Sequence, residues 1–306
     1  MHKNLFITVV LSLMLQPLRA AEIRHRFIAK DESRCQVVYV DQTDPSKDWV
    51  LELGAKCRDT QLVGNNVLLV SSPDGYREYS LANRKMIKEV KGYPGAMSAR
   101  RRPDGRTILA CVQKEVTVYE LSAQDQVRRK VVFKVPSTRI VRLTPQGTLL
   151  FGCKEQLFEG DLEGHVLRTF TLPPGSWVYQ ALRKPNGNLL VSGGYNPSLF
   201  ELDPNGRILK TIGGKESAEA KTLDYHFFGA FQMLKNGDLV VCNWTGHGPR
   251  DGEKGAQILQ FDPSGKVVWK WHDTVRAGSI HGVILMDDLD PAVLNDDVSS
   301  VLGPAK

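Results

Sequence analysis

The amino-acid sequence predicts an all-β fold, a six-bladed β-propeller with four antiparallel strands in each blade. Short apolar runs rich in β-forming residues recur along the chain at a spacing of about forty residues. Tight polar turns separate these runs. The two ends of the chain together complete one repeat, and this match indicates a closed ring. A seven-bladed ring is the alternative, with a further unit hidden in the weakly patterned stretch 211–227 or 289–306.

The first apolar run of each repeat follows a turn and has the length of a strand. A second run comes next, such as VTVYEL at 116–121, and a third follows a tight turn, such as VVFKV at 131–135. A further strand precedes each first run, as in YQALRKPNG at 179–187. The repeat is therefore a unit of four antiparallel strands. The first runs are NNVLLV (65–70), GRTILA (105–110), GTLLFG (147–152), GNLLVS (187–192) and GDLVVC (237–242).

The two chain ends are predicted to share one blade. Residues 36–53 line up with 257–271, so the first unit fits the common template. This unit has only one strand ahead of it, around 24–29. Residues 281–288 line up with the innermost strand at 228–237 and supply the strand that the first unit lacks. The ring is thus closed by N-terminal and C-terminal strands.

The N-terminal residues have the features of a secretory signal peptide. His2 and Lys3 form a basic tip, an apolar stretch covers 5–15, and Ala20 is a small residue suited to cleavage. A single membrane anchor is the alternative, but the apolar stretch is short for a bilayer. We expect cleavage near Ala20 and a secreted or periplasmic protein without membrane insertion. The predicted division is a signal peptide at 1–20, the propeller at 21–288 and a C-terminal tail at 289–306.

The composition is typical of a folded domain, with 42% hydrophobic and 24% charged residues. The formal net charge of +6 is spread along the chain. Arg100, Arg101 and Arg102 form the only triplet of arginines, which is typical of a solvated strand end. We therefore expect no nucleic-acid partner.

Five cysteines are an odd number for an exported protein, so at least one is expected to stay unpaired. Cys111, Cys153 and Cys242 fall at the ends of apolar strands and are expected to be small buried hydrophobes. Cys35 and Cys57 fall near the ends of neighbouring predicted strands. A disulfide between these two is left open.

The two faces of the predicted ring differ in loop length. The turns after the first and third strands of each unit are uniformly short. The loops after the second and fourth strands are longer and uneven, and they include 213–226 and 243–255. Long loops on a rigid scaffold are the usual place for a binding site. We therefore expect the binding site on this second face, the long-loop face.

Aromatic and cationic side chains gather in the loops of the long-loop face. An aromatic platform beside an arginine suits a carbohydrate or another polar ring-shaped ligand, because one side of a sugar is apolar enough to stack. Packing between blades is the alternative. The candidate ligand-binding residues are Arg139, Trp177, Tyr195, Trp244, His247 and Arg250.

Three histidines are candidate metal ligands on the same face. His226 and His281 precede the inner strands of neighbouring blades, and His247 lies in the long loop of blade six. Three neutral imidazoles that converge would form a metal site with open positions. The alternative is that each histidine binds a loop carbonyl at the start of a strand, because no acidic ligand accompanies them at a clear spacing.

FDPSGKVVWKW at 261–271 resembles the end of the repeat shared by quinoprotein-type propellers, and NWTGHG at 243–248 resembles a feature of one group within them. This group comprises secreted bacterial β-propeller proteins with PQQ-like or WD40-like repeats. The resemblance implies the fold and no catalytic assignment. Quinoprotein dehydrogenases of this type generally have eight blades, and this sequence shows no vicinal cysteine pair and no clear acidic set for calcium. PQQ is therefore not the expected cofactor.

The first functional hypothesis is an exported binding or scaffold protein whose long-loop face recognises a carbohydrate, a peptide or a protein partner. It requires no catalytic set, and the sequence contains no recognisable Ser-His-Asp, paired-carboxylate or nucleotide-loop motif. The alternative is a hydrolase or lyase acting on a saccharide or lactone, with the three histidines holding a divalent metal. A PQQ-dependent oxidoreductase is the second alternative. The fold alone does not choose among them.

Overall fold

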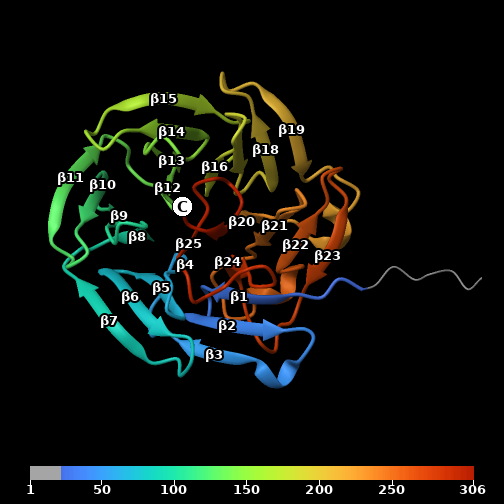
Figure 1. Ribbon diagram of the computed structural model, residues 1–306. Helices are drawn as coiled ribbons and strands as arrows, with labels where there is room; N and C mark the ends of the chain where they lie inside the picture. Colours follow the sequence, from blue (N-terminus) through green and yellow to red (C-terminus); the bar gives the residue numbers. More distant parts are fainter. Residues whose placement is uncertain (1–21) are drawn as a thin grey trace, which may run out of the picture.

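The computed structural model describes residues 22–306 as a ring of six four-stranded antiparallel sheets (Figure 1). The predicted six-bladed β-propeller is confirmed, and so is its closure by both ends of the chain. The alternative of seven blades is wrong for the described residues, since 211–227 holds only one short helix besides the end of a strand. The predicted signal peptide lies outside the described residues. Within 22–306, no helix is long and apolar enough to span a membrane.

Each blade is numbered by its place in the chain, and its strands are given from the axis outward. Blade one has β24 (Ile280–Leu285), β1 (Arg26–Asp31), β2 (Gln36–Asp41) and β3 (Trp49–Glu52). Blade two has β4 (Thr60–Leu62), β5 (Val67–Ser72), β6 (Gly75–Ser80) and β7 (Met86–Lys91). Blade three has β8 (Ala96–Arg101), β9 (Thr107–Val112), β10 (Val116–Leu121) and β11 (Val127–Phe133).

The second half of the ring repeats this order. Blade four has β12 (Arg142–Leu143), β13 (Leu149–Cys153), β14 (Gln156–Gly160) and β15 (Val166–Thr171). Blade five has β16 (Ala181–Arg183), β17 (Leu189–Ser192), β18 (Ser198–Leu202) and β19 (Ile208–Gly213). Blade six has β20 (Phe228–Met233), β21 (Leu239–Asn243), β22 (Ile258–Phe261) and β23 (Val267–Trp271). Outside the blades lie η1 (Pro45–Lys47), α1 (Ala220–Leu223), η2 (Asp251–Lys254), β25 (Asn295–Asp296) and β26 (Gly303–Pro304).

The tight turn after the third strand has the same physical basis in three blades. In blade six, the Asp262 carboxylate accepts backbone N–H bonds from Ser264 at 2.8 Å and from Lys266 at 3.0 Å. Gly265 completes the turn at φ 94°, in the left-handed region that other residues rarely adopt. Asp161 and Asp203 hold the equivalent turns of blades four and five. An aspartate followed three residues later by glycine therefore marks this turn in the sequence.

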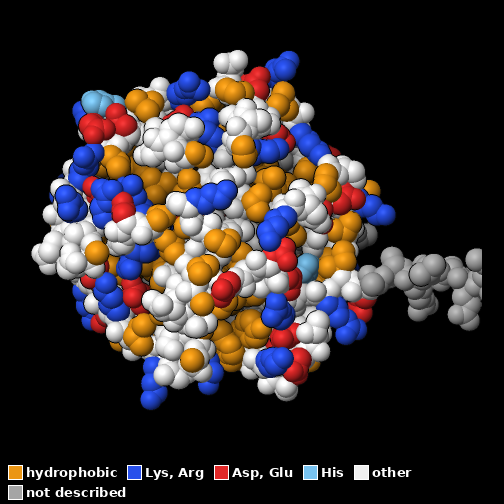
Figure 2. All heavy atoms as spheres, viewed as in Figure 1, with side chains coloured by type: hydrophobic (Ala, Val, Ile, Leu, Met, Phe, Trp, Pro, Cys, Tyr) orange, Lys and Arg blue, Asp and Glu red, His pale blue; other side chains and the backbone are white. Residues whose placement is uncertain are grey.

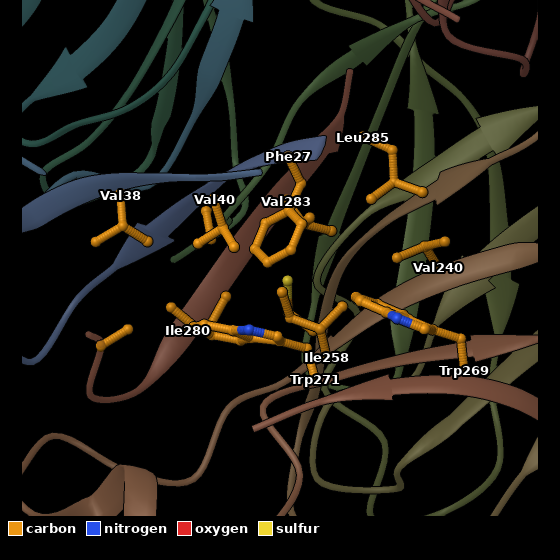
Figure 3. Packing of buried hydrophobic residues seen from close by; sticks show 13 residues of the cluster. Phe27, Val38, Val40, Val240, Ile258, Trp269, Trp271, Ile280, Val283 and Leu285 are labelled. Carbon is orange, nitrogen blue, oxygen red and sulfur yellow. The ribbon is translucent and has the colours of Figure 1, made fainter. Parts of the chain in front are cut away.

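Ring closure rests on packing between blades six and one. β1 pairs with β24 on one side and with β2 on the other, so the N-terminal strand is held between two partners. Phe27 contacts Trp269 and Trp271 edge to face, with ring centroids 6.0 and 5.3 Å apart (Figure 3). Both tryptophans are buried, as expected for residues that pack on the outermost strand. The His25 ring adds polar contacts to Asp287 at 2.6 Å and to Gln260 at 2.7 Å.

The C-terminal segment, residues 289–306, crosses the middle of the ring on the face of the tight turns (Figure 1). Its Leu294 pairs with Val63 of blade two, and its Val301 pairs with Met233 of blade six. Figure 2 shows side chains filling the middle of the face in view, with cationic and acidic groups interspersed. The sequence did not show whether this tail packs on the ring. The structure shows that it does.

A buried ion-pair network, formed by Asp59, Arg100, Arg142 and Asp297, fixes this segment to three blades. Asp297 contacts Arg142 at 2.7 Å and Arg100 at 2.9 Å, and Arg142 also contacts Asp59 at 2.9 Å. Burial would raise the pKa of both carboxyl groups, but the two guanidinium groups outweigh it and hold each pKa below its ordinary value. The network is therefore charged at neutral pH.

All five cysteines lie within the described residues and are free thiols, so the disulfide left open between Cys35 and Cys57 is not formed. Cys35 is half-buried and Cys57 is buried. Cys111, Cys153 and Cys242 are buried, as expected of small hydrophobes. Burial raises the pKa of Cys57 and of Cys111 to about 12. These thiols are therefore protonated and unreactive at neutral pH.

Candidate functional site

The apolar strand β21 runs into a long loop because its last residue, Asn243, anchors that loop. Asn243 is fully buried. Its side-chain amide donates hydrogen bonds to the carbonyl groups of Asp224 and Ala256, both at 2.8 Å. Its Oδ1 accepts the backbone N–H of His226 at 2.7 Å. One side chain therefore joins the 244–256 loop to the loop that enters blade six, and both are held at the mouth of the ring.

Glu32 is the acidic centre of the long-loop face, and its side chain is completely buried. It lies in the turn between β1 and β2, where its backbone N–H donates to the carbonyl of Ser279 at 3.0 Å. One carboxylate oxygen lies 2.9 Å from an Arg58 nitrogen. The other lies 3.0 Å from His247 Nδ1 and 3.4 Å from His281 Nδ1. Glu32 thus gathers side chains from blades one, two and six.

His281 is held in the neutral form at this site. Its side chain is buried, and the ring stacks on Trp244 with centroids 5.0 Å apart. Burial lowers its pKa well below the ordinary value, and the nearby Arg58 charge lowers it further. Arg58 also lies 3.3 Å from His281 Nδ1. Arginine only donates hydrogen bonds, so Nδ1 is the acceptor in this contact and the ring proton of the neutral form is on Nε2. The 3.4 Å approach of Glu32 to the same Nδ1 is then a close contact and not a hydrogen bond.

His247 differs from His281 because its side chain is 58% exposed. Its Nδ1 faces the Glu32 carboxylate, which accepts hydrogen bonds and does not donate them. Nδ1 therefore carries a proton, and in the neutral ring Nε2 keeps a free lone pair. A carboxylate that orients an imidazole in this way is a recurrent arrangement in catalytic sites.

A chain of aromatic contacts, the aromatic wall, adjoins these histidines. Trp244 contacts Phe227 with centroids 5.4 Å apart, and Phe227 contacts Tyr195 at 4.8 Å. Tyr195 contacts Trp177 at 6.1 Å, and the guanidinium carbon of Arg139 lies 6.0 Å from the centre of the Trp177 ring. The wall is defined by Trp177, Tyr179, Tyr195, Phe227 and Trp244.

The structure brings five of the six candidate ligand residues into this connected set. Trp244 and Trp177 are largely buried in it, whereas the Tyr195 side chain is half-exposed. Arg250 lies apart, since it pairs with Glu253 of its own loop at 2.9 Å and its side chain is 82% exposed. Within the connected set, Tyr195 and His247 are the most exposed side chains and are therefore the most accessible to a ligand.

Several polar groups beside the aromatic wall have no hydrogen-bond partner among residues 22–306. They include the Tyr179 hydroxyl and the Trp244 indole N–H, both of which are buried. Among residues 22–306, no carboxylate lies within ion-pair distance of the Arg139 guanidinium. Burial and the Arg58 charge lower its pKa. Unpaired buried polar groups cost free energy unless water or a ligand satisfies them.

The three candidate metal ligands do not converge. His226 is exposed, while His247 and His281 both turn toward Glu32. In residues 22–306 no three His, Cys, Asp or Glu side chains are arranged to hold a metal ion. Arg58 at 2.9 Å and Lys56 at 3.8 Å already compensate the Glu32 charge, so this carboxylate is not free to act as an acidic metal ligand. These residues do not fit the expected metal site.

Glu32, Arg58 and Tyr179 are site residues that the sequence did not single out. Glu32 lies in the loop after the second strand of its blade, the same place that the 243–255 loop occupies in blade six. Tyr179 and Arg58 lie in loops that enter inner strands, as His226 does. Their position in the repeat was the available signal. No pattern in the sequence favoured these residues over their neighbours.

No family model matches this chain, and no curated protein matches it. Many solved structures share its fold. One is a protein of unknown function from Bacteroides caccae, 21% identical, with a TM-score of 0.72 over 86% of this chain and 99% of that one.

Two other similar structures are of a lyase and a calcium-binding protein. One is a catalytically inactive variant of virginiamycin B lyase from Staphylococcus aureus with quinupristin, 12% identical, with a TM-score of 0.55 over 83% of this chain and 86% of that one. The other is regucalcin from Agrobacterium tumefaciens, a calcium-binding protein, 11% identical, with a TM-score of 0.52 over 70% of this chain and 80% of that one. At these identities the likeness shows the β-propeller fold alone.

Proposed function

We propose that this protein is an exported β-propeller that binds a ligand carrying a carboxylate and a ring with an apolar face. Acidic saccharides of the uronate class are the first ligands of this kind to test. The observation that carries the proposal is Arg139, whose guanidinium lies by Trp177 and has no acidic partner in residues 22–306. Arginine binds carboxylates through two parallel hydrogen bonds, and the neighbouring aromatic rings supply a stacking surface.

The charge at the mouth of the ring favours an anionic ligand. Arg58, Lys56 and Arg139 are cationic, and Glu32 is the acidic group among them. Because Glu32 already pairs with Arg58 at 2.9 Å, its charge is compensated before any ligand arrives. A ligand carboxylate would compensate the positive charge of Arg139.

The test is calorimetric titration of the protein with acidic uronate oligosaccharides and with neutral oligosaccharides of matched linkage. We expect binding of the acidic series only. Arg139→Ala should weaken it by at least about tenfold, the loss expected for a charge-assisted pair. Arg250→Ala is the matched control, since Arg250 lies on the same face and is already paired, and it should change affinity by less than about twofold. Equal binding of neutral oligosaccharides, or equal loss in both variants, would contradict the proposal. A peptide or protein partner with an acidic group would then be sought.

A lyase acting on the same class of ligand is the second candidate, and the Glu32–His247 pair favours it. With Arg139 on the ligand carboxylate, the exposed Nε2 of His247 would take the proton from the carbon beside that carboxylate. The electron pair of the broken C–H bond would form a carbon–carbon double bond as the C–O bond to the glycosidic oxygen breaks. The departing oxygen keeps the C–O electron pair and would take up a proton from the His247 imidazolium or from water. The virginiamycin B lyase similarity is compatible with elimination chemistry on this fold. No metal-dependent step is proposed, because the residues do not fit a metal.

Ultraviolet absorbance of the new conjugated double bond measures this reaction directly. His247→Ala and Glu32→Gln should each abolish the rise in absorbance while leaving oligosaccharide binding through Arg139 in place. Binding without any such rise in the unaltered protein would leave the binding function and remove the lyase. A PQQ-dependent oxidoreductase is not carried further, since quinoprotein dehydrogenases with this type of repeat generally have eight blades and this ring has six.

A further inference from the structure

A cavity lies on the axis of the ring, between the candidate site on the long-loop face and the C-terminal segment. Inner strands of several blades and the C-terminal segment line it, and they are independent of the residues proposed to bind a saccharide. The residues on which the argument depends are Lys30, Gln232, Gly282, Asn295 and Ser300.

Lys30 reaches this cavity from the second strand of blade one. It pairs in register with Gly282 of the innermost strand β24. A Cβ atom at position 282 would lie 3.1 Å from Lys30 Nζ and 3.2 Å from Cε. The missing side chain of Gly282 is therefore what lets the lysine cross the inner strand toward the axis. The Lys30 residue is only 2% exposed.

The Lys30 amine has no hydrogen-bond or ion-pair partner among residues 22–306. The buried ion-pair network nearby does not compensate it, because Asp59 and Asp297 are matched by Arg100 and Arg142. Burial is the main reason that the pKa of Lys30 is lowered. An isolated buried ammonium strongly destabilises the folded state, so a protein normally pairs such a group or deprotonates it.

Other polar groups that line the same cavity are also without partners in the described residues. The Ser300 hydroxyl is fully buried and unbonded, and it can donate a hydrogen bond. Gln232 accepts the backbone N–H of Leu285 through its Oε1, and its amide N–H groups donate to no described residue. The Asn295 Oδ1 is an unbonded acceptor. A cavity with an uncompensated cation and free donors has the chemistry of an anion site.

We propose that this cavity binds a small monovalent anion, such as a halide or a short carboxylate, beside Lys30 Nζ. The anion compensates the ammonium charge inside the ring and accepts hydrogen bonds from donors that otherwise have none. Asn295 Oδ1 requires a donor, which water in the same cavity supplies. The site is distinct from the proposed saccharide site, and Arg139 takes no part in it.

Bromide is the probe, because its anomalous X-ray scattering identifies it directly. Crystals grown in sodium bromide should show an anomalous peak within about 3.5 Å of Lys30 Nζ. In solution, raising bromide against a bulky organic anion at constant ionic strength should raise the Tm of the unaltered protein by about 2 to 4 °C, since only the folded state holds the site. Lys30→Met should remove both the peak and the anion dependence. Arg139→Ala should keep both, which separates this test from that of the saccharide site.

Two results would overturn the proposal. One is an ordered chain of waters at Lys30 with no anomalous peak and equal Tm in both salts, which would show a neutral amine. The other is a peak seen only at crystallisation concentrations of bromide with no change in Tm, which would show an adventitious ion only. Both readouts are made on the unaltered protein, so they stand even if Lys30→Met does not fold.

Discussion

Asp297 is the residue through which the C-terminal segment is tied into the ring, and Asp297→Ala tests that role. The carboxylate pairs with Arg142 at 2.7 Å and with Arg100 at 2.9 Å, and both arginine side chains are less than one-tenth exposed. Removing one member of a buried ion-pair network costs about 3 to 5 kcal/mol, because the remaining charges stay buried. Here two guanidinium groups would be left to share Asp59, so the loss should lie toward the upper end.

Thermal unfolding followed by circular dichroism measures this change. A loss of about 3 to 5 kcal/mol corresponds to a Tm lower by about 5 to 8 °C in a protein of this size. Asp296→Ala is the matched control, since the neighbouring side chain forms no ion pair within residues 22–306 and accepts only a 3.3 Å hydrogen bond from the Val298 backbone. A Tm for Asp297→Ala within about 2 °C of the control would refute the argument. The segment would then lie on the ring without stabilising it.

Three further predictions concern acid stability, packing and thiol reactivity. The pKa values of Asp59 and Asp297 are lowered in the folded state. The two carboxylates therefore contribute fully to the free energy of unfolding above the unfolded-state pKa of about 3.9, and this contribution is lost as the pH falls through the folded-state pKa values. Urea unfolding between pH 6 and about pH 3 should show this loss, and an equal slope in Asp297→Asn would contradict it. Trp271→Ala should lower the free energy of unfolding by about 3 to 5 kcal/mol, because the Trp271 ring packs on Phe27 between blades six and one. Tyr195→Ala removes a half-exposed ring and should lower it by less than about 1.5 kcal/mol in the same urea assay. In the native protein a thiol reagent should modify Cys35 at most, since the other four thiols are buried; mass spectrometry would reveal a second adduct if this is wrong.

The sequence was sufficient for the blades because their signals are local. An aspartate that binds two backbone N–H groups ahead, with glycine at positive φ, produces the same turn wherever it occurs, as at Asp203 and Asp262. The match between the two end segments predicted β24 in blade one, because pairing β24 with β1 satisfies the backbone hydrogen bonds along the edges of both strands.

The site was less predictable because its geometry depends on contacts between distant loops. Trp244 and Trp177 followed from residue type and face, and the structure joins them through Phe227 and Tyr195. The histidines were expected to meet one another. They meet Glu32 instead, from a short turn at the other end of the chain. No spacing in a single sequence reports such a contact, and the same holds for Lys30 above Gly282.

The position of Glu32 has a consequence for how the protein becomes functional. Glu32 follows the first strand of the chain, whereas His247 and His281 come from its last quarter. The cluster at the mouth therefore spans the seam where the ring closes, and it cannot exist before the final inner strand has docked. A ligand that contacts this cluster would bridge the first and last parts of the chain across the seam. Only a chain with a closed ring could therefore bind that ligand. Circular permutation that moves the chain ends to one of the tight turns should preserve the cluster, because the cluster depends on closure of the ring and not on where the chain begins.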